Sequence, residues 1–435
     1  MRAEGARALG VVGGGVFFAI LGVANPFFAL FAQQLGASTM AIGAMVTLRA
    51  VLPIVIAMPS GQLIDRIGPM RMLLVGMLAL LVSLGLTALA RGPILLSASQ
   101  LFLGVSILLT ASSLQVLVST GEAEARDAGI KRYAVWMSGG AVLGPILGGL
   151  LVGSYETSLE GYRMAFVAAF LVTALLTGAI ALLTRLYPHS ETGDAAAAAR
   201  EVMTLDGVAQ SWREGWGLAR HGPVRFGLAA TFLMVFLSTT YTTFLPVFMK
   251  DSGYATLAIS IALAANHVAG LFARSILGRL TPTYSLDAIL LGAAGVAALG
   301  VAATPLAVHA SPALILVVFV IGGATGVNLP VSIMIMVAGI GQAERGKLMG
   351  LRLLMNRFGQ LLAPSVFGAA GQAYGLSAAF AFGGGLLGAV ALALAAVTGH
   401  APDLRRGGRW AQGRARRWAR RRARKVARAG REGAA

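Results

Sequence analysis

Long apolar stretches alternate with short polar segments along most of the 435-residue chain. An α-helix rises about 1.5 Å per residue, so roughly 20 apolar residues cross a bilayer core of about 30 Å. The stretches do not show the two-residue alternation of a half-buried strand. The pattern therefore predicts an all-α membrane protein with twelve transmembrane helices, at residues 10–32, 40–60, 72–90, 93–118, 133–153, 163–186, 224–248, 255–278, 286–305, 312–338, 348–370 and 376–398.

One long polar segment divides these helices into two groups of six. Residues 126–149 align with residues 345–368, which places Pro145 on Pro364 and indicates an internal repeat. We therefore expect an N-terminal half at 1–186, a cytoplasmic linker at 187–223, a C-terminal half at 224–400 and a basic tail at 401–435, disordered or on the membrane surface. Apolar linker residues at helical spacing predict an amphipathic surface helix, a simple tether being the alternative, at Leu205, Val208, Ala209, Trp212, Trp216 and Ala219.

The amino-acid composition is that of a chain that is mostly surrounded by lipid. Hydrophobic residues make up 57% of the sequence and charged residues 12%, with a mean hydropathy of +0.77. A water-soluble domain of this composition would expose large apolar patches. The chain has no cysteine, which excludes disulfides, iron–sulfur clusters and cysteine-based zinc sites.

The basic residues predict how the chain sits in the membrane. Most of the 35 Lys and Arg fall on the side of the termini, whereas Arg91, Arg163 and Lys250 fall on the other side. The positive-inside rule then places both termini in the cytoplasm, and the chain in the cytoplasmic membrane of a prokaryote or an equivalent bilayer. An Arg-rich segment after the last helix predicts contact with anionic lipid head groups. A nucleic-acid module does not accompany it, so we expect no nucleic-acid partner.

The segment after the second predicted helix reads Gly61-Gln62-Leu63-Ile64-Asp65-Arg66-Ile67-Gly68. It resembles the signature loop between helices 2 and 3 of the major facilitator superfamily. The resemblance implies that Gly61, Asp65, Arg66 and Gly68 form a latch between the outward-open and inward-open states. Glycine permits a tight turn, and a carboxylate is favoured near a helix N-terminus. The family's basic pair is reduced here to Pro69-Met70-Arg71, which predicts a weaker latch.

The fifth predicted helix carries Gly140, Gly144, Pro145, Gly148 and Gly149. This pattern is similar to the helix 5 motif of the superfamily's antiporters, many of which export drugs or metabolites. Small residues at this spacing also form an ordinary packing groove, and proline removes one backbone hydrogen bond, so the alternative is a purely structural motif. The family fold implies a cavity between the halves, with helices 2 and 11, and 5 and 8, facing each other.

The fourth predicted helix departs from the family pattern. Proton-coupled relatives commonly carry an arginine near the start of helix 4, in a pattern that ends in glycine. This chain has Gln100-x3-Gly104 instead. This position therefore has no residue that could take the proton-coupling role of that arginine.

Basic side chains lie inside several predicted helices, whereas Asp and Glu are absent from the helix bodies. Intramembrane charges are costly and normally face a wet cavity or a partner. For Arg274 and Arg352, near the cytoplasmic ends, we favour snorkelling. For Arg49 and Arg357, capping of a carbonyl freed by a helix bend is the alternative to a role in the cavity. His267 is the candidate proton carrier, and a packing histidine is the alternative. The expected cavity set is Asn25, Arg49, Tyr241, Asn266, His267, Asn328, Asn356, Arg357 and Gln360, with Ser238–Thr243 as further polar lining.

These features predict a secondary active transporter of a small organic solute, working by alternating access and exporting an amphipathic or anionic compound. Organic-anion uptake or exchange is one alternative, and a transporter-like sensor or scaffold is another. A proton or a counter-anion is the expected coupling ion. The sequence has neither a phosphate-binding Gly-x4-Gly-Lys-Ser/Thr loop nor a convergent set of in-span acids or metal ligands, so we expect no enzyme activity, no cofactor and no metal.

Overall fold

The computed structural model describes residues 3–120, 122–186, 213, 216–337, 340 and 344–397. Its first half contains α1 (Ala3–Gln34), α2 (Thr39–Ile67), α3 (Pro69–Leu89), α4 (Pro93–Val118), α5 (Ala123–Gly153) and α6 (Ser158–Leu186). Its second half contains α9 (Gly222–Asp251), α10 (Thr256–Leu280), α11 (Leu286–Ala307), α12 (Ser311–Gly326), α13 (Asn328–Val337) and α14 (Arg345–Val397).

Eleven helical segments of the described chain are long and apolar enough to span a membrane. The last of them, Leu348–Leu394, has 47 residues, which at about 1.5 Å per residue exceeds one bilayer crossing. It bends at Gly375, where φ is 79°, a value that glycine adopts without a Cβ penalty. It therefore contains both of the last two predicted helices, and the predicted all-α membrane fold is confirmed.

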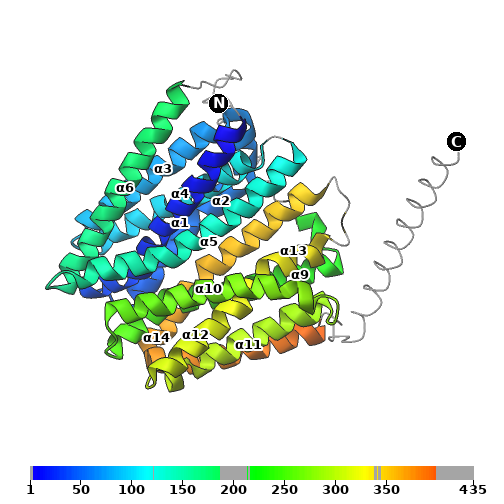
Figure 1. Ribbon diagram of the computed structural model, residues 1–435. Coiled ribbons are helices and arrows are strands. Elements are labelled where there is room, and N and C mark those ends of the chain that lie inside the picture. The colour runs from blue at the N-terminus through cyan, green and yellow to red at the C-terminus, as the bar shows by residue number, and fades with distance from the viewer. Residues whose placement is uncertain are drawn as a thin grey trace.

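The helices form two bundles that lie side by side, α1–α6 in blue to green and α9–α14 in green to orange (Figure 1). We call the end with residues 3, 67–69, 119–122 and 280–286 the terminal end, because α1 begins there. The opposite end, with the turns at 35–38, 90–92, 154–157 and 252–255, is the distal end. Between the bundles, α1 packs on α9, α2 on α14 and α5 on α10, the arrangement that the family resemblance implies.

Polar contacts join the two bundles in the distal half of the molecule. Thr47 Oγ1 on α2 donates to the Leu361 carbonyl of α14 at 2.9 Å and lies 2.7 Å from Ser365 Oγ. Gln33 Nε2 at the end of α1 donates to Asp251 Oδ1 at the end of α9, at 2.6 Å. These contacts hold the distal side of the interface together.

The same seam brings the backbones of α2 and α14 into contact. A Cβ built on Gly43 would overlap the Pro364 carbonyl oxygen, and one on Gly368 would lie 2.9 Å from the Thr39 carbonyl oxygen. Such close approach is typical of helices in lipid, where small residues allow dense packing. Glycine at these positions is therefore a requirement of the distal closure.

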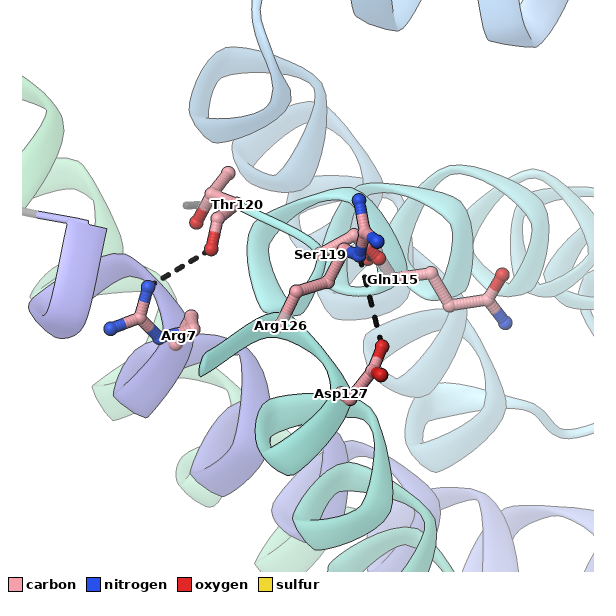
Figure 2. A network of polar contacts seen from close by, with 6 residues as sticks. All are labelled: Arg7, Gln115, Ser119, Thr120, Arg126 and Asp127. Atoms are coloured by element: carbon pink, nitrogen blue, oxygen red, sulfur yellow. Dashed lines mark hydrogen bonds and ion pairs between the residues drawn. The ribbon is translucent and has the colours of Figure 1, made fainter. Parts of the chain in front are cut away.

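At the terminal end, the turn between α4 and α5 is tied to α1. Arg7 Nη1 donates to the Thr120 carbonyl at 2.9 Å, and Ser119 Oγ donates back to the Gln115 carbonyl within α4 (Figure 2). The nearby Arg126 and Asp127 form an exposed ion pair with N···O at 3.9 Å. An exposed pair of this length contributes little to stability, so the Arg7 contact does most to fix the turn.

The expected loop after the second helix is mostly helical, and this part of the prediction was wrong. Helix α2 continues to Ile67, so Gly61 lies inside it, and the turn is made by Gly68 alone with φ of 92°. Gly68 N–H caps α2 by donating to the Ile64 carbonyl. Arg66 is exposed, and the surroundings of Gly61 and of the Asp65 side chain lie outside what the structure describes.

The predicted helix at 312–338 is interrupted between α12 and α13. Pro330 has no N–H to donate to the Gly326 carbonyl, which frees that oxygen. Arg274 Nε of α10 donates to it instead, at 3.2 Å. Arg274 is exposed, but it also caps this carbonyl, which the snorkelling interpretation did not include.

Two further predictions concern segments at the edge of the described chain. Most of the proposed linker helix lies outside the described residues; Trp216 is exposed, and Ala219 packs against an apolar cluster that includes Leu218 and Leu351. The basic tail at 401–435 also lies outside the described residues.

Candidate functional site

A cavity of about 340 Å³ lies between the two bundles. Its wall is built from α1, α2, α4 and α5 of the first half and from α9, α10 and α14 of the second half. Of the residues expected from the sequence, Asn25, Arg49, His267, Arg357 and Gln360 line it. The volume falls within the range of sites that enclose small molecules.

Arg49, half-buried on α2, is held by side chains from two other helices. Its Nη1 donates to Asn25 Oδ1 of α1 at 2.7 Å. Its Nε and Nη2 both donate to Gln100 Oε1 of α4, at 3.0 and 2.5 Å. One guanidinium therefore links α1, α2 and α4, and all three of its nitrogen atoms have a partner.

The sequence analysis named Gln100 only as a replacement for the family's arginine and missed its role. Gln100 is 1% exposed, and its side-chain oxygen accepts hydrogen bonds from the guanidinium of Arg49 on α2. Next to it, Gly104 lets α4 approach α2, because a Cβ there would overlap the Arg49 carbonyl oxygen and lie 3.1 Å from Pro53 Cγ. A polar residue near the start of an apolar helix was the only available signal for Gln100.

Arg357 is 7% exposed and lies on α14, across the interface from Arg49. Its Nη1 donates to Gln360 Oε1, one turn further along the same helix, at 2.7 Å. Its Nε is buried without a hydrogen-bond partner among the described residues. Arg357 is thus positioned by Gln360 but retains donors that the protein does not use.

The wall of the cavity is cationic. Within the described part of the chain, its lining includes Arg49, Arg357 and His267 but no carboxylate. A guanidinium in a low-dielectric region is costly unless an opposite charge or acceptors compensate it. The arrangement therefore favours an anion in the cavity.

A second cavity of about 260 Å³ continues toward the terminal end between α5 and α10. It shares Phe18, Ala141, Ser238, Thr242 and His267 with the first cavity. Asn266 lines only this second cavity, where its Nδ2 donates to the Val318 carbonyl of α12 at 3.1 Å. The shared wall residues make the two cavities neighbours, whereas the hydrogen bonds described above close the distal side.

Several residues expected at the cavity lie elsewhere. Tyr241 is 1% exposed inside the second half, with its ring against Phe380 and its hydroxyl 3.5 Å from Thr304 Oγ1. Asn328 on α13 is buried, and its Oδ1 has no partner among the described residues. Asn356 is half-buried and is not part of the cavity wall.

Arg352 contradicts the snorkelling interpretation. It is 6% exposed, and its Nε donates to Ser332 Oγ of α13 at 3.2 Å. A snorkelling arginine would extend its guanidinium toward the membrane surface. Instead Arg352 holds α13 against α14 inside the second half.

The glycines of the helix 5 motif are packing positions. A Cβ on Gly140 or Gly144 would overlap carbonyl oxygens of α1, and one on Gly148 would overlap the Phe27 ring. Pro145 lines the cavity. Gly149 faces the other half, where a Cβ would overlap Ser260 Oγ of α10. The motif therefore brings α5 into close contact with α1 in its own half and with α10 in the other.

Comparison with solved structures shows the same fold in known transporters. A mutant form of the nucleoside transporter NupG matches with a TM-score of 0.73 at 14% sequence identity, covering 90% of this chain and 99% of that chain. A POT family transporter in complex with 5-aminolevulinic acid matches with a TM-score of 0.67 at 14% identity, covering 92% and 96%. A mutant form of the peptide transporter POT in complex with sulfate matches with a TM-score of 0.66 at 15% identity, covering 92% and 95%.

No curated protein matches the sequence. A family model does match it: the model described as Major Facilitator Superfamily aligns with residues 10–337, which include nearly all of the first half and most of the second. The alignment spans well over half of the 435 residues. The chain belongs to the Major Facilitator Superfamily.

Proposed function

We propose that this protein is a secondary transporter that moves a small organic anion through the central cavity by alternating access. The observation that carries the proposal is the placement of Arg49 and Arg357, one from each half, on a cavity wall whose described residues include no carboxylate. An anion between two halves can interact with both, and its passage then couples to their relative movement. Family membership favours transport over enzyme activity.

The contacts between the halves support alternating access. The distal side is held by Thr47 and by the Gln33–Asp251 pair, while the second cavity leads from the central one toward the terminal end. This is the arrangement of a state open on one side. A sensor or scaffold that had lost transport would be expected to fill its cavity with bulky side chains, whereas this cavity retains about 340 Å³.

The solved neighbours support a small polar solute. They are transporters of nucleosides and peptides, and one was solved with 5-aminolevulinic acid. Solutes of this size are compatible with the cavity volume. The neighbours share only the fold with this chain, so the anionic class rests on the arginines.

We further propose export, with both termini in the cytoplasm. The helix 5 motif resembles that of antiporters, and its glycines bring α5 against both α1 and α10. The basic residues concentrate at the terminal end and in the tail. By the positive-inside rule this end is cytoplasmic, and the second cavity extends toward it, so in this proposal the described state faces the cytoplasm, from which an exporter takes up its solute.

The test is transport of organic anions in proteoliposomes, combined with thermal stabilisation of the purified protein in detergent. A ligand that binds only the folded protein raises its melting temperature. Arg357→Gln should abolish stabilisation by organic anions, while Arg220→Gln, at an exposed arginine outside the cavity, should leave it unchanged. Stabilisation by cations or neutral amphiphiles alone, unchanged in Arg357→Gln, would contradict the proposal.

A further inference from the structure

Prolines lie one helical turn after several residues of the cavity wall. A proline has no N–H, so the carbonyl four residues before it loses its helical hydrogen-bond partner. The prolines are Pro26 in α1, Pro145 in α5, Pro246 in α9 and Pro364 in α14. The residues four positions earlier, all of which line the central cavity, are Gly22, Ala141, Thr242 and Gln360.

These four residues differ from most other residues that precede a proline by one turn because they belong to the cavity wall. Gly22 has no side chain, so only its backbone atoms can line the cavity. Backbone polar groups at membrane depth need a partner, since lipid offers none. By contrast, Pro305 in α11 follows Val301, which is 1% exposed and lies outside the cavity.

Pro53 in α2 gives an internal comparison. It frees the Arg49 carbonyl in the same way, but Gly104 of α4 packs directly on that oxygen. This carbonyl is therefore covered by protein. The remaining freed carbonyls on the wall require either water or a group of the solute.

Hydroxyl groups on α9 add further acceptors. Thr242 Oγ1 donates its proton to the Ser238 carbonyl at 2.9 Å, so its oxygen presents only lone pairs to other groups. A hydroxyl whose proton is committed to its own helix acts as an acceptor. The α9 face of the cavity is therefore rich in acceptors.

The two arginines differ in what they can offer a solute. Arg49 donates through all three of its nitrogen atoms to Asn25 and Gln100. Arg357 donates to Gln360 alone, and its Nε has no partner among the described residues. A guanidinium has five N–H groups; Arg49 uses three of them in these bonds, whereas Arg357 uses one in a bond to a described residue, so Arg357 offers a solute more free donors than Arg49 does.

We infer that the solute is a hydroxylated organic acid, whose acid group binds Arg357 and whose hydroxyl groups donate to the carbonyl oxygens freed by Pro26, Pro145, Pro246 and Pro364. This inference rests on the proposed function and specifies its substrate class. An acid without donor groups would leave the carbonyls unpaired, and a neutral polyol would leave Arg357 unpaired. Neither satisfies both parts of the wall.

The experiment compares matched acids that differ in hydroxyl groups: lactate with propionate, malate with succinate, and gluconate with hexanoate. Sorbitol supplies hydroxyl groups without an acid. Apparent affinities are measured by thermal shift on the purified full-length protein. One hydrogen bond is worth about 1 kcal/mol, or roughly fivefold in affinity. In at least one pair, the hydroxylated acid should therefore bind at least about fivefold more tightly than the acid without the hydroxyl group.

The variants test whether the prolines are the cause. Pro145→Ala with Pro246→Ala restores two backbone donors, so the ratio of the affinities for the hydroxylated and the plain acid should fall at least about threefold. Pro305→Ala is the matched control and should keep the full preference. Arg357→Gln should weaken both acids of a pair equally. Size-exclusion chromatography verifies that each variant is folded.

The outcomes separate this inference from the proposed function. If the plain acids bind as tightly as the hydroxylated ones, or if no hydroxylated acid binds, the inference is overturned and anion transport still stands on the plain acids. If sorbitol binds as tightly as gluconate, the inference and the anionic substrate class both fail. An unchanged preference in the double proline variant would overturn the role of the freed carbonyls.

Discussion

Replacing Gln100 by leucine tests whether Arg49 is held by the protein itself. Gln100 Oε1 accepts from both Nε and Nη2 of Arg49, and leucine offers no acceptor in a similar volume. A hydrogen bond to a charged group contributes about 1.5–3 kcal/mol, and removing one partner of a buried charge costs about 3–5 kcal/mol. Asn25 still accepts from Nη1, and Arg49 is only half-buried, so we expect a loss of about 3 kcal/mol, the value at which the two ranges meet.

The matched variant is Gln100→Glu, which keeps the shape and supplies a negative charge to the same nitrogen atoms. We expect it to be at least as stable as the wild type and to bind organic anions more weakly, because it neutralises one of the two cavity cations. The assay is equilibrium unfolding in mixed micelles, with anion binding by thermal shift. A loss of less than about 1 kcal/mol in Gln100→Leu would refute the interpretation that Arg49 is held by α1 and α4.

Three further changes test the packing, the distal contacts and the latch. Gly104→Ala should destabilise the protein by about 1–3 kcal/mol in the same unfolding assay, because its Cβ overlaps the Arg49 carbonyl oxygen. Gly139→Ala, which has open space around it, should leave the stability unchanged. Equal stability of the two variants would count against the close packing of α4 on α2. Thr47→Val removes two distal hydrogen bonds worth about 1 kcal/mol each, or about thirtyfold together. A cysteine placed at Ser238 in this cysteine-free chain should therefore react about thirtyfold more with a thiol reagent from the distal face, and unchanged labelling would argue against a distal closure. Asp65→Asn should slow transport in proteoliposomes without weakening ligand binding, and an unchanged rate would remove the latch hypothesis.

The membrane fold could be predicted because it depends on quantities local to the sequence. An apolar run of sufficient length has few alternatives to a helix in lipid, and the predicted 93–118 coincides with α4. The turn at Gly68 follows from a residue that tolerates a positive φ. The α12–α13 break also had a local cause, Pro330, but a proline inside an apolar run can equally be accommodated within a continuous transmembrane helix.

The partners of the charged residues could not be predicted in this way. Helical periodicity gives the face on which Arg49 or Arg352 lies, but not which polar residue of another helix reaches it. Gln100 and Ser332 are separated from these arginines by 51 and 20 residues. Similarly, the ring of Tyr241 packs against Phe380, so packing of the ring determines its position and its hydroxyl group does not line the cavity.

Backbone acceptors on the cavity wall have a consequence for how this protein can evolve. A side-chain ligand is lost when its own codon changes, whereas the carbonyl of Ala141 or Thr242 persists whatever residue occupies that position. Only loss of the proline four residues later would remove it. The backbone acceptors that recognise hydroxyl groups are therefore retained through most side-chain substitutions. Substrate specificity can still change through substitutions around Arg357 while the prolines stay the same. The internal repeat places Pro145 on Pro364, so both halves carry a proline at the same position of the repeat.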